Sequence, residues 1–200
     1  MYRLYAITND NATIENIEEA IKSGITMLQL REKNLSYDEF LSKAKEVKKI
    51  TDKYNIPLII NDRVDIALEI NANGVHLGQT DGNVKYARDT APKDFIIGVT
   101  AKTIEQAKDA ERNGATYLGS GAVNGSKTKL DAKKISIEEL NDICSSVSIP
   151  VVAIGGITAS NLDNLNGTKI KGIAVSNSIF DEEDVNFAVK ALLDKIGGII

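Results

Sequence analysis

Short apolar runs alternate with longer amphipathic runs along the whole chain. The short runs, apolar or alternating apolar and polar, predict strands at residues 2–8, 27–33, 57–62, 74–78, 96–101, 116–123, 150–156 and 172–179. Apolar positions spaced three and four apart predict helices at residues 14–23, 37–54, 64–71, 84–91, 104–113, 137–146, 160–165 and 184–196. A strand–helix pair therefore recurs with a period of about 25 residues.

This alternation predicts parallel strands joined by right-handed helical crossovers. Eight such units predict an α/β fold, a (β/α)8 TIM barrel, with residues 1–200 forming a single domain. The alternative is an open doubly wound sheet, which usually carries Gly-x-Gly-x-x-Gly after its first strand. The segment "YAITNDNATIE" contains no glycine, so the closed barrel is favoured.

Turn and capping residues punctuate the same pattern. Three glycines follow helical runs and are predicted to cap the helix carboxyl ends: Gly24, Gly74 and Gly114. Four helices are predicted to begin on a hydroxyl cap: Thr13, Ser36, Thr103 and Ser136. Thr103 and Ser136 also have Gln or Glu three residues later, which is the spacing of a capping box.

Composition and charge narrow the functional classes. A net charge of −4 without a basic stripe argues against a nucleic-acid binder. No run of about 18 apolar residues predicts a membrane span, and the start of the chain lacks the apolar core of a secretion signal. One cysteine, Cys144, cannot form an internal disulfide, which suits a reducing cytoplasm. We therefore expect a cytoplasmic protein that binds neither nucleic acid nor membrane. A local basic pocket for a phosphorylated metabolite and a homo-oligomer are both left open.

The predicted strands end on polar residues, and in this fold the carboxyl ends of the strands form the active site. In "LQLREK", Gln29, Arg31 and Lys33 alternate with Leu28 and Leu30, which predicts that the polar set faces the barrel interior near its mouth. The alternative is a solvated strand face. Because helices cover the outside of such a barrel, the inward reading is favoured.

Two carboxylates follow neighbouring strands. Asp62 comes directly after Asn61 at the end of the third strand, and Asp81 follows the fourth strand in "GVHLGQTD". Mg²⁺ takes oxygen ligands and usually binds only one or two carboxylates besides water and phosphate oxygens. The pair therefore predicts a magnesium site, although each aspartate taken alone could be a helix cap or a turn residue.

The later strands lead into segments that suit phosphate. "GSKTK" at residues 125–129 combines glycine, hydroxyls and two lysines, which can hold phosphate oxygens but also suit a flexible surface loop. "AIGGIT" and "AVSNSI" end the seventh and eighth strands, whose loops commonly bind phosphate in this fold. His76, the only histidine, lies within the fourth strand and is predicted to be a hydrogen-bonded interior residue and not a general base.

Together these motifs resemble one family. "LQLREK", "LIINDR", "GVHLGQTD", "GVTAKT", "SKTK" and "VAIGGIT" stand in the order and spacing of thiamine phosphate synthase, from about residue 2 to residue 181. The paralogous thiazole tautomerase carries a working histidine shortly after the sixth strand, where this chain has Ala122. The tautomerase also tends to lose the second acidic ligand, whereas Asp81 is present. The synthase is therefore preferred.

The chain departs from the family pattern in two loops. Where the synthase usually has Gly-Pro-x-Phe-Pro-Thr after the sixth strand, this chain has "GAVNGS", with Ala122, Asn124 and Gly125 at the altered positions. Where the family has Ser-x-His after the fifth strand, this chain has Thr100-Ala101-Lys102. A threonine hydroxyl can replace a serine hydroxyl, while the altered sixth loop is expected to be looser.

The resemblance implies a reaction and a set of roles. The reaction joins 4-amino-2-methyl-5-(diphosphomethyl)pyrimidine to a thiazole phosphate and releases diphosphate, with Mg²⁺ on Asp62 and Asp81. The implied catalytic residues are Arg31, Thr100 and Lys129. The implied substrate-binding residues are Gln29, Arg31, Lys33, Asn61, Thr100, Ser126, Lys127, Thr128, Lys129, Gly156, Ser176 and Asn177. The alternatives are the tautomerase and a non-catalytic regulator that binds thiamine precursors.

Overall fold

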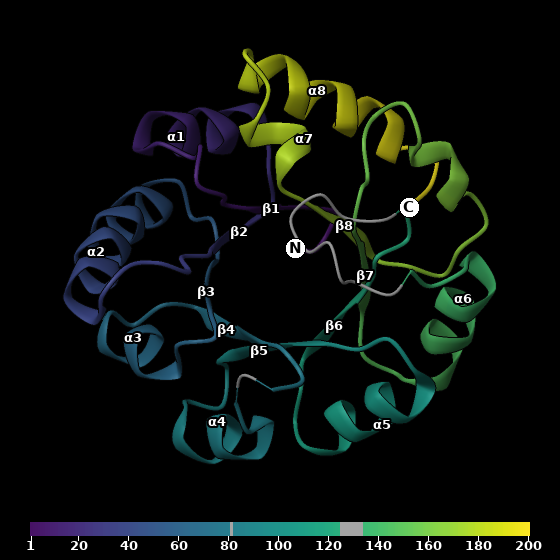
Figure 1. The fold of residues 1–200 in the computed structure, drawn as a ribbon, viewed down its shortest axis with the longest axis horizontal. Coiled ribbons are helices and arrows are strands. Elements are labelled where there is room, and N and C mark those ends of the chain that lie inside the picture. Colours follow the sequence, from purple (N-terminus) through teal and green to yellow (C-terminus); the bar gives the residue numbers. More distant parts are fainter. Residues whose placement is uncertain (81, 125–133) are drawn as a thin grey trace.

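The computed structural model describes residues 1–80, 82–124 and 134–200. Its strands are β1 (Leu4–Ile7), β2 (Met27–Leu30), β3 (Leu58–Asn61), β4 (Gly74–Leu77), β5 (Ile96–Thr100), β6 (Tyr117–Gly121), β7 (Val151–Ile154) and β8 (Gly172–Val175). All neighbouring pairs are parallel, and β8 pairs with β1, so the sheet closes into a barrel. Figure 1 looks along this barrel, with the strands as an inner ring and the helices around it. The predicted (β/α)8 barrel is confirmed.

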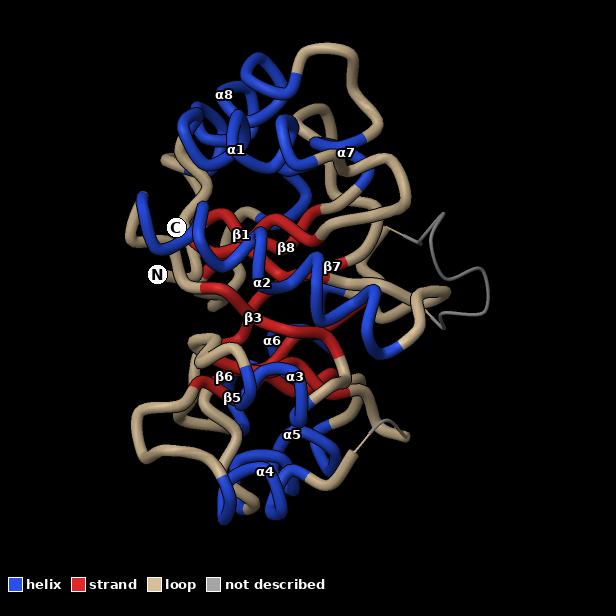
Figure 2. Tube along the Cα trace, turned by 90° about the vertical axis from the view of Figure 1, so that its left-hand side faces the viewer, coloured by secondary structure: helices blue, strands red, loops and turns tan. Residues whose placement is uncertain are grey.

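The helices are α1 (Ile14–Ser23), α2 (Tyr37–Lys53), α3 (Val64–Glu69), α4 (Val84–Thr90), α5 (Ile104–Arg112), α6 (Ile137–Ser146), the 3-10 helix η1 (Leu162–Leu165), α7 (Asn177–Phe180) and α8 (Val185–Ile196). In the described part of the chain, none of them is long and apolar enough to cross a membrane. Both chain ends lie at the amino ends of the strands, on the left in Figure 2.

The hydroxyl caps form as predicted. The side chains of Thr13, Ser36, Thr103 and Ser136 each accept a hydrogen bond from the third residue of their helix. At Ser136 the full capping box is present, and Ser36 forms a second one with Glu39. At Thr103 the box is incomplete, because the Gln106 side chain accepts from the Lys102 backbone N–H instead.

Two of the three predicted glycine caps are confirmed. Gly24 and Gly114 have φ values of 116° and 97°, in the left-handed region that glycine adopts at low cost. Gly74 does not cap a helix but opens β4. A Cβ there would lie 2.2 Å from the Ile96 carbonyl oxygen, so this glycine allows the close approach of two strands. The left-handed turn after α3 falls instead on Asn71, with φ 52°.

One predicted strand is too long, and one predicted helix is of a different type. The strand predicted at residues 172–179 ends at Val175, because β1 offers no partner beyond Ala6 in that register. The chain continues into α7, which buries Ile179 and Phe180. The helix predicted at residues 160–165 is a 3-10 turn, in which Leu162 and Leu165 lie three residues apart on its buried face.

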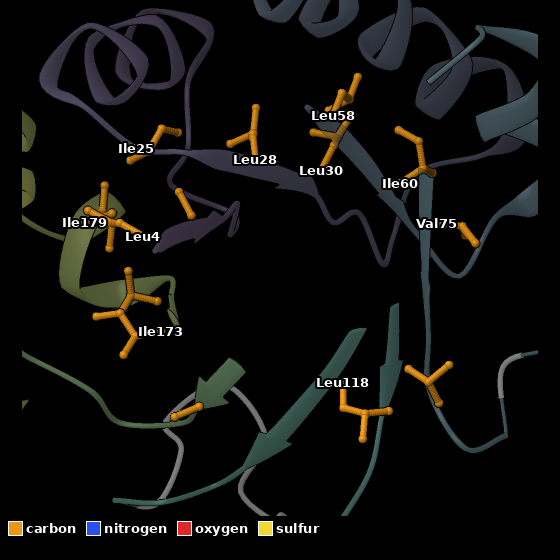
Figure 3. Packing of buried hydrophobic residues seen from close by; sticks show 14 of the residues in the cluster. Leu4, Ile25, Leu28, Leu30, Leu58, Ile60, Val75, Leu118, Ile173 and Ile179 are labelled. Carbon is orange, nitrogen blue, oxygen red and sulfur yellow. The ribbon is translucent and has the colours of Figure 1, made fainter. Parts of the chain in front are cut away.

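The buried residues form two layers. The larger layer lies between the strands and the helices, and Figure 3 shows part of it, including Leu28, Leu30 and Ile60. The smaller layer fills the inside of the barrel and contains Tyr5, Ile7, Met27, Ile59, Tyr117, Val152 and Ala174. Successive strand residues alternate between the layers, as Leu4 and Tyr5 do. This alternation aims the polar residues near the strand ends into the barrel mouth.

Candidate active site

A cavity of about 520 Å³ opens at the carboxyl ends of the strands. It is lined by residues of all strands or the loops that follow them, including Thr8, Gln29, Arg31, Asn61, Asp62, His76, Thr100, Asn124, Gly155, Gly156, Ser176, Asn177 and Asp181. Its position is where (β/α)8 enzymes bind their substrates. Of the predicted site residues, the cavity therefore brings together Gln29, Arg31, Asn61, Asp62, Thr100, Gly156, Ser176 and Asn177.

The end of β2 supplies the first two polar side chains. Gln29 faces inward and is buried, and its Nε2 donates to the Tyr5 hydroxyl over 2.7 Å. Arg31 follows the strand, held by a backbone N–H bond of 2.9 Å to Thr8 Oγ1. Its Nη2 atom is buried without a hydrogen-bond partner among the described residues. A buried guanidinium nitrogen of this kind needs an acceptor from a ligand.

Lys33 lies elsewhere. β2 ends at Leu30, so the inward alternation does not continue to residue 33. Lys33 is exposed and does not line the cavity. The structure thus supports the inward orientation for Gln29 and Arg31 and leaves a substrate contact of Lys33 as a prediction.

The end of β3 holds Asn61 and Asp62 at the cavity wall. Asp62 has φ 62°, a left-handed conformation that is uncommon for a residue with a side chain. Its backbone N–H donates to the His76 carbonyl over 2.9 Å. The Asn61 amide donates to Asp62 Oδ2 over 2.5 Å. These contacts hold the carboxylate at the cavity in a backbone conformation that costs free energy, and such conformations cluster at functional sites.

The donor set fits a hard cation. Asp62 presents a carboxylate at the cavity with the Asn61 amide beside it, and Mg²⁺ needs only one or two carboxylates. Asp81, the second predicted ligand, lies outside the described residues. Among residues 1–80, 82–124 and 134–200, no group of three His, Cys, Asp or Glu side chains could hold a metal. A magnesium site here would take the Asp62 carboxylate, with ligand and water oxygens beside it, and Asp81 stays a predicted second ligand.

His76 is an interior, hydrogen-bonded residue, as predicted. Its Nδ1 lies 2.9 Å from the Tyr117 hydroxyl and its Nε2 lies 3.0 Å from Thr100 Oγ1. The Tyr117 hydroxyl also contacts the Tyr5 hydroxyl at 2.9 Å. Tyr5 and Tyr117 were not predicted as site residues, because in the sequence they read as apolar strand positions.

The loops after β7 and β8 form the end of the cavity predicted to hold phosphate. Gly155 and Gly156 line the cavity and have φ values of 102° and 62°, in the left-handed region that glycine adopts at low cost. Because they have no side chains, a ligand can approach their backbone closely. The Ser176 hydroxyl is buried without a hydrogen-bond partner in the described part of the chain. The Asn177 amide donates to Asp181, so a ligand at this residue would meet mainly its backbone.

Asp181 accepts hydrogen bonds from two separate segments at this end of the barrel. Besides Asn177, the side-chain amides of Asn9 and Asn11 each donate to Asp181 Oδ1 over 2.8 Å. The carboxylate thereby links the loop after β1 to α7. The sequence offered no signal for this contact, because the residues lie about 170 positions apart.

The loop after β6 is described only at its start. Ser126, Lys127, Thr128 and Lys129 lie outside the described residues. Asn124 precedes them, and its backbone N–H donates to the Gly155 carbonyl over 3.0 Å. Its Nδ2 is buried at the cavity with no partner among the described residues. Asn124 is therefore a further ligand-facing residue, at one of the positions where the chain departs from the family pattern.

A closed (β/α)8 barrel with a polar cavity at the strand carboxyl ends is the arrangement in which enzymes of this fold bind their substrates. The chain matches the family model described as Thiamine monophosphate synthase over residues 4–179. It therefore belongs to the thiamine monophosphate synthase family, and the resemblance inferred from its motifs is confirmed.

Individual relatives agree with this assignment. A thiamine-phosphate synthase of Clostridium acetobutylicum is 49% identical over 198 residues, covering 96% of this chain and 94% of the relative. One of Clostridium tetani is 53% identical over 176 residues, covering 88% and 84%. The solved structure of thiamine phosphate pyrophosphorylase from Pyrococcus furiosus has a TM-score of 0.92 at 36% identity, covering 99% of this chain and 96% of that one. The expectation of a thiamine-biosynthesis transferase is confirmed.

Proposed function

We propose that the protein joins 4-amino-2-methyl-5-(diphosphomethyl)pyrimidine to a thiazole phosphate in this cavity, giving thiamine phosphate and diphosphate. One observation carries the proposal. Arg31 Nη2, Asn124 Nδ2 and Ser176 Oγ are buried at a single cavity, and none has a partner among the described residues. Buried polar atoms are almost always hydrogen-bonded, so the cavity is built for a ligand with several polar groups.

The chemical problem is to break a carbon–oxygen bond to a highly charged leaving group. The Arg31 guanidinium can donate in a bidentate manner to diphosphate oxygens, where negative charge grows as the bond breaks. Asn61 at the end of β3 and Thr100 at the end of β5 would add neutral donors, and Lys33 and Lys129 would add positive charge. Mg²⁺ held by Asp62 and Asp81 would supply Lewis-acid stabilisation of the same leaving group.

The second substrate would lie at the other end of the cavity. The backbone of Gly156 and Asn177 and the Ser176 hydroxyl would hold its phosphate, together with Ser126, Lys127 and Thr128. The displacement is dissociative: diphosphate departs first with the electron pair of the carbon–oxygen bond, and the electron-rich aminopyrimidine carries the resulting cation at its methylene carbon. The thiazole nitrogen then attacks this carbon. Because the nitrogen already carries a lone pair, no residue has to act as a nucleophile or strong base, and positioning supplies much of the rate.

The proposal includes a cytoplasmic location. The chain has a single cysteine, Cys144, which burial keeps unreactive by raising its pKa to about 11. A protein without disulfides suits the reducing compartment in which phosphorylated precursors are made.

The test is diphosphate release from the pyrimidine substrate with Mg²⁺, with and without thiazole phosphate, and detection of thiamine phosphate by mass. Arg31→Met should lower kcat/KM at least a hundredfold while the melting temperature stays within a few degrees, because the lost guanidinium faces the ligand and not the core. Arg63→Met is the matched control. Arg63 pairs with Asp65 and does not line the cavity, so its replacement should leave turnover intact.

Two results would contradict the proposal. Absence of coupled diphosphate release by the wild-type protein would favour the tautomerase or the regulator. Equal turnover of the Arg31→Met and Arg63→Met variants would show that the diphosphate binds elsewhere.

A further inference from the structure

A chain of hydrogen bonds crosses the barrel interior below the cavity. The Gln29 amide of β2 contacts the Tyr5 hydroxyl of β1 at 2.7 Å, and Tyr5 contacts the Tyr117 hydroxyl of β6 at 2.9 Å. Tyr117 contacts His76 Nδ1 of β4 at 2.9 Å, and His76 Nε2 contacts Thr100 Oγ1 of β5 at 3.0 Å. Gln29, His76 and Thr100 line the cavity, whereas the two tyrosines lie beneath it. The chain thus joins separate parts of the cavity wall through the core.

The two linking phenols are neutral. Tyr5 and Tyr117 are 1% and 0% exposed. Burial raises the pKa of both hydroxyls above the usual range, so each keeps its proton throughout the physiological range. Each phenol therefore has one proton to donate and can accept from a neighbour, which makes the chain directional.

The direction follows from one end. Gln29 Nε2 carries protons and donates to Tyr5, so the single Tyr5 proton is directed to the Tyr117 oxygen. Tyr117 must then donate to His76 Nδ1, which becomes an acceptor. A neutral imidazole whose Nδ1 accepts carries its proton on Nε2, and that proton is directed to Thr100. The Thr100 hydroxyl accepts it and retains its own proton to donate.

We propose that Tyr5 and Tyr117 are positioning residues that fix His76 as the Nε2–H tautomer. They thereby determine which groups of the cavity wall donate hydrogen bonds to a ligand and which accept them. In this state Gln29 turns its carbonyl oxygen, an acceptor, away from Tyr5, and Thr100 keeps a donor. The wall then suits a ligand with an N–H donor at Gln29 and an anionic oxygen at Thr100. This deepens the proposed function and rests on it, because the aminopyrimidine diphosphate carries both groups.

The interior is shaped around this chain. A Cβ on Gly98 would lie 2.1 Å from the Tyr117 ring carbon that bears the hydroxyl, and one on Gly119 would lie 3.1 Å from His76 Cε1. The Tyr117 ring therefore occupies space that only glycine leaves open at residue 98, and a side chain at residue 119 would crowd the His76 ring. The Tyr2 and Tyr117 ring centroids lie 5.1 Å apart, so Tyr117 is packed on more than one side. Packing of this kind holds the hydroxyls at fixed positions.

The lone histidine makes the proposal directly measurable. With ¹⁵N-labelled histidine, at a pH where the ring is neutral, NMR of the wild-type protein should show one protonated ring nitrogen, Nε2, and one hydrogen-bonded acceptor, Nδ1. Tyr117→Phe removes the donor to Nδ1 but keeps the ring, so the spectrum should move to a mixture of tautomers. Tyr5→Phe removes only the preceding link and should give a smaller change of the same kind.

Kinetics give the second measurement. Losing one hydrogen bond of this chain is expected to lower kcat about tenfold in Tyr117→Phe, with a smaller rise in KM, because misdirected donors reduce productive binding geometry. Tyr86→Phe is the matched control, since Tyr86 is 61% exposed on α4 and should change neither the spectrum nor the rate. Melting temperatures of all three variants show whether any loss comes from unfolding.

An Nδ1–H tautomer in the wild-type protein would overturn the proposal. So would a Tyr117→Phe variant with the wild-type histidine spectrum and wild-type kcat. The spectrum does not depend on the reaction, so a protein that fails to make thiamine phosphate but shows the Nε2–H tautomer would refute the proposed function and leave the hydrogen-bond chain standing.

Discussion

Because Asp62 has a left-handed backbone conformation, the effect of this residue on stability can be measured separately from its effect on turnover. A side chain at φ 62° costs about 1–2 kcal/mol relative to glycine, while glycine loses about 0.4–1 kcal/mol more chain entropy on folding. Asp62→Gly should therefore be more stable than Asp62→Ala by about 0.5–1 kcal/mol. For a chain of this length, that difference raises the melting temperature by roughly 1–4 °C. Both variants lack the carboxylate and should lose most turnover.

The assay combines thermal melts with diphosphate release. Asn55 provides the control pair, because it has φ 54° and does not line the cavity. Asn55→Gly should likewise melt above Asn55→Ala, while both keep full turnover. A loss of turnover that followed the melting temperature across all four variants would show that residue 62 acts only through stability.

A third measurement tests the metal directly. Mg²⁺ with inorganic diphosphate should raise the melting temperature of the wild-type protein. At a free ligand concentration of ten times the dissociation constant, binding adds about 1.4 kcal/mol to the free energy of unfolding. Neither Asp62 variant should show this shift. An equal shift in the wild-type protein and in Asp62→Gly would refute the assignment of Asp62 as a ligand, and so would full activity of Asp62→Gly in chelator.

Three further outcomes follow from the structure. Gly98→Ala should lower stability by about 1–3 kcal/mol, measured by urea unfolding, because the new methyl group meets the Tyr117 ring. Lys33→Ala should lower kcat/KM for the diphosphate substrate without lowering the melting temperature, because the residue is exposed. Hydrogen bonds from Ser148 lower the pKa of Glu111, so this carboxylate stabilises the fold above its unfolded pKa and the benefit is lost as pH falls through the folded value. Melts of Glu111→Gln should therefore differ from wild type near neutral pH and converge in acid.

The sequence was sufficient for the barrel because each element carries its own local signal. The buried stripe of α1 and its caps at Thr13 and Gly24 reproduce the predicted bounds at residues 14–23. Strand centres were equally clear, but strand ends depend on the neighbour's register, which no local pattern shows. That is why the inward alternation was extended too far at Lys33 and why α7 was predicted as a strand.

The site was predictable wherever a polar residue stands at a strand end. Gln29, Arg31 and Asn61 all line the cavity for this reason. The contact between Tyr5 and Tyr117 was not predictable, because it joins residues 112 positions apart through hydroxyls on otherwise apolar strand positions. The left-handed conformation of Asp62 was also not predictable from the sequence, because aspartate is common in ordinary turns as well.

The fit between Gly98 and Tyr117 has a consequence for how this protein can change. The ring on β6 fills the space that the missing side chain on β5 leaves, so each position sets the size allowed at the other. A methyl group at residue 98 becomes acceptable only when residue 117 is smaller, and a smaller residue 117 leaves a void unless residue 98 grows. Related sequences should therefore exchange the two positions together, and a library that randomises them as a pair should yield barrels that are more stable than those with either substitution alone.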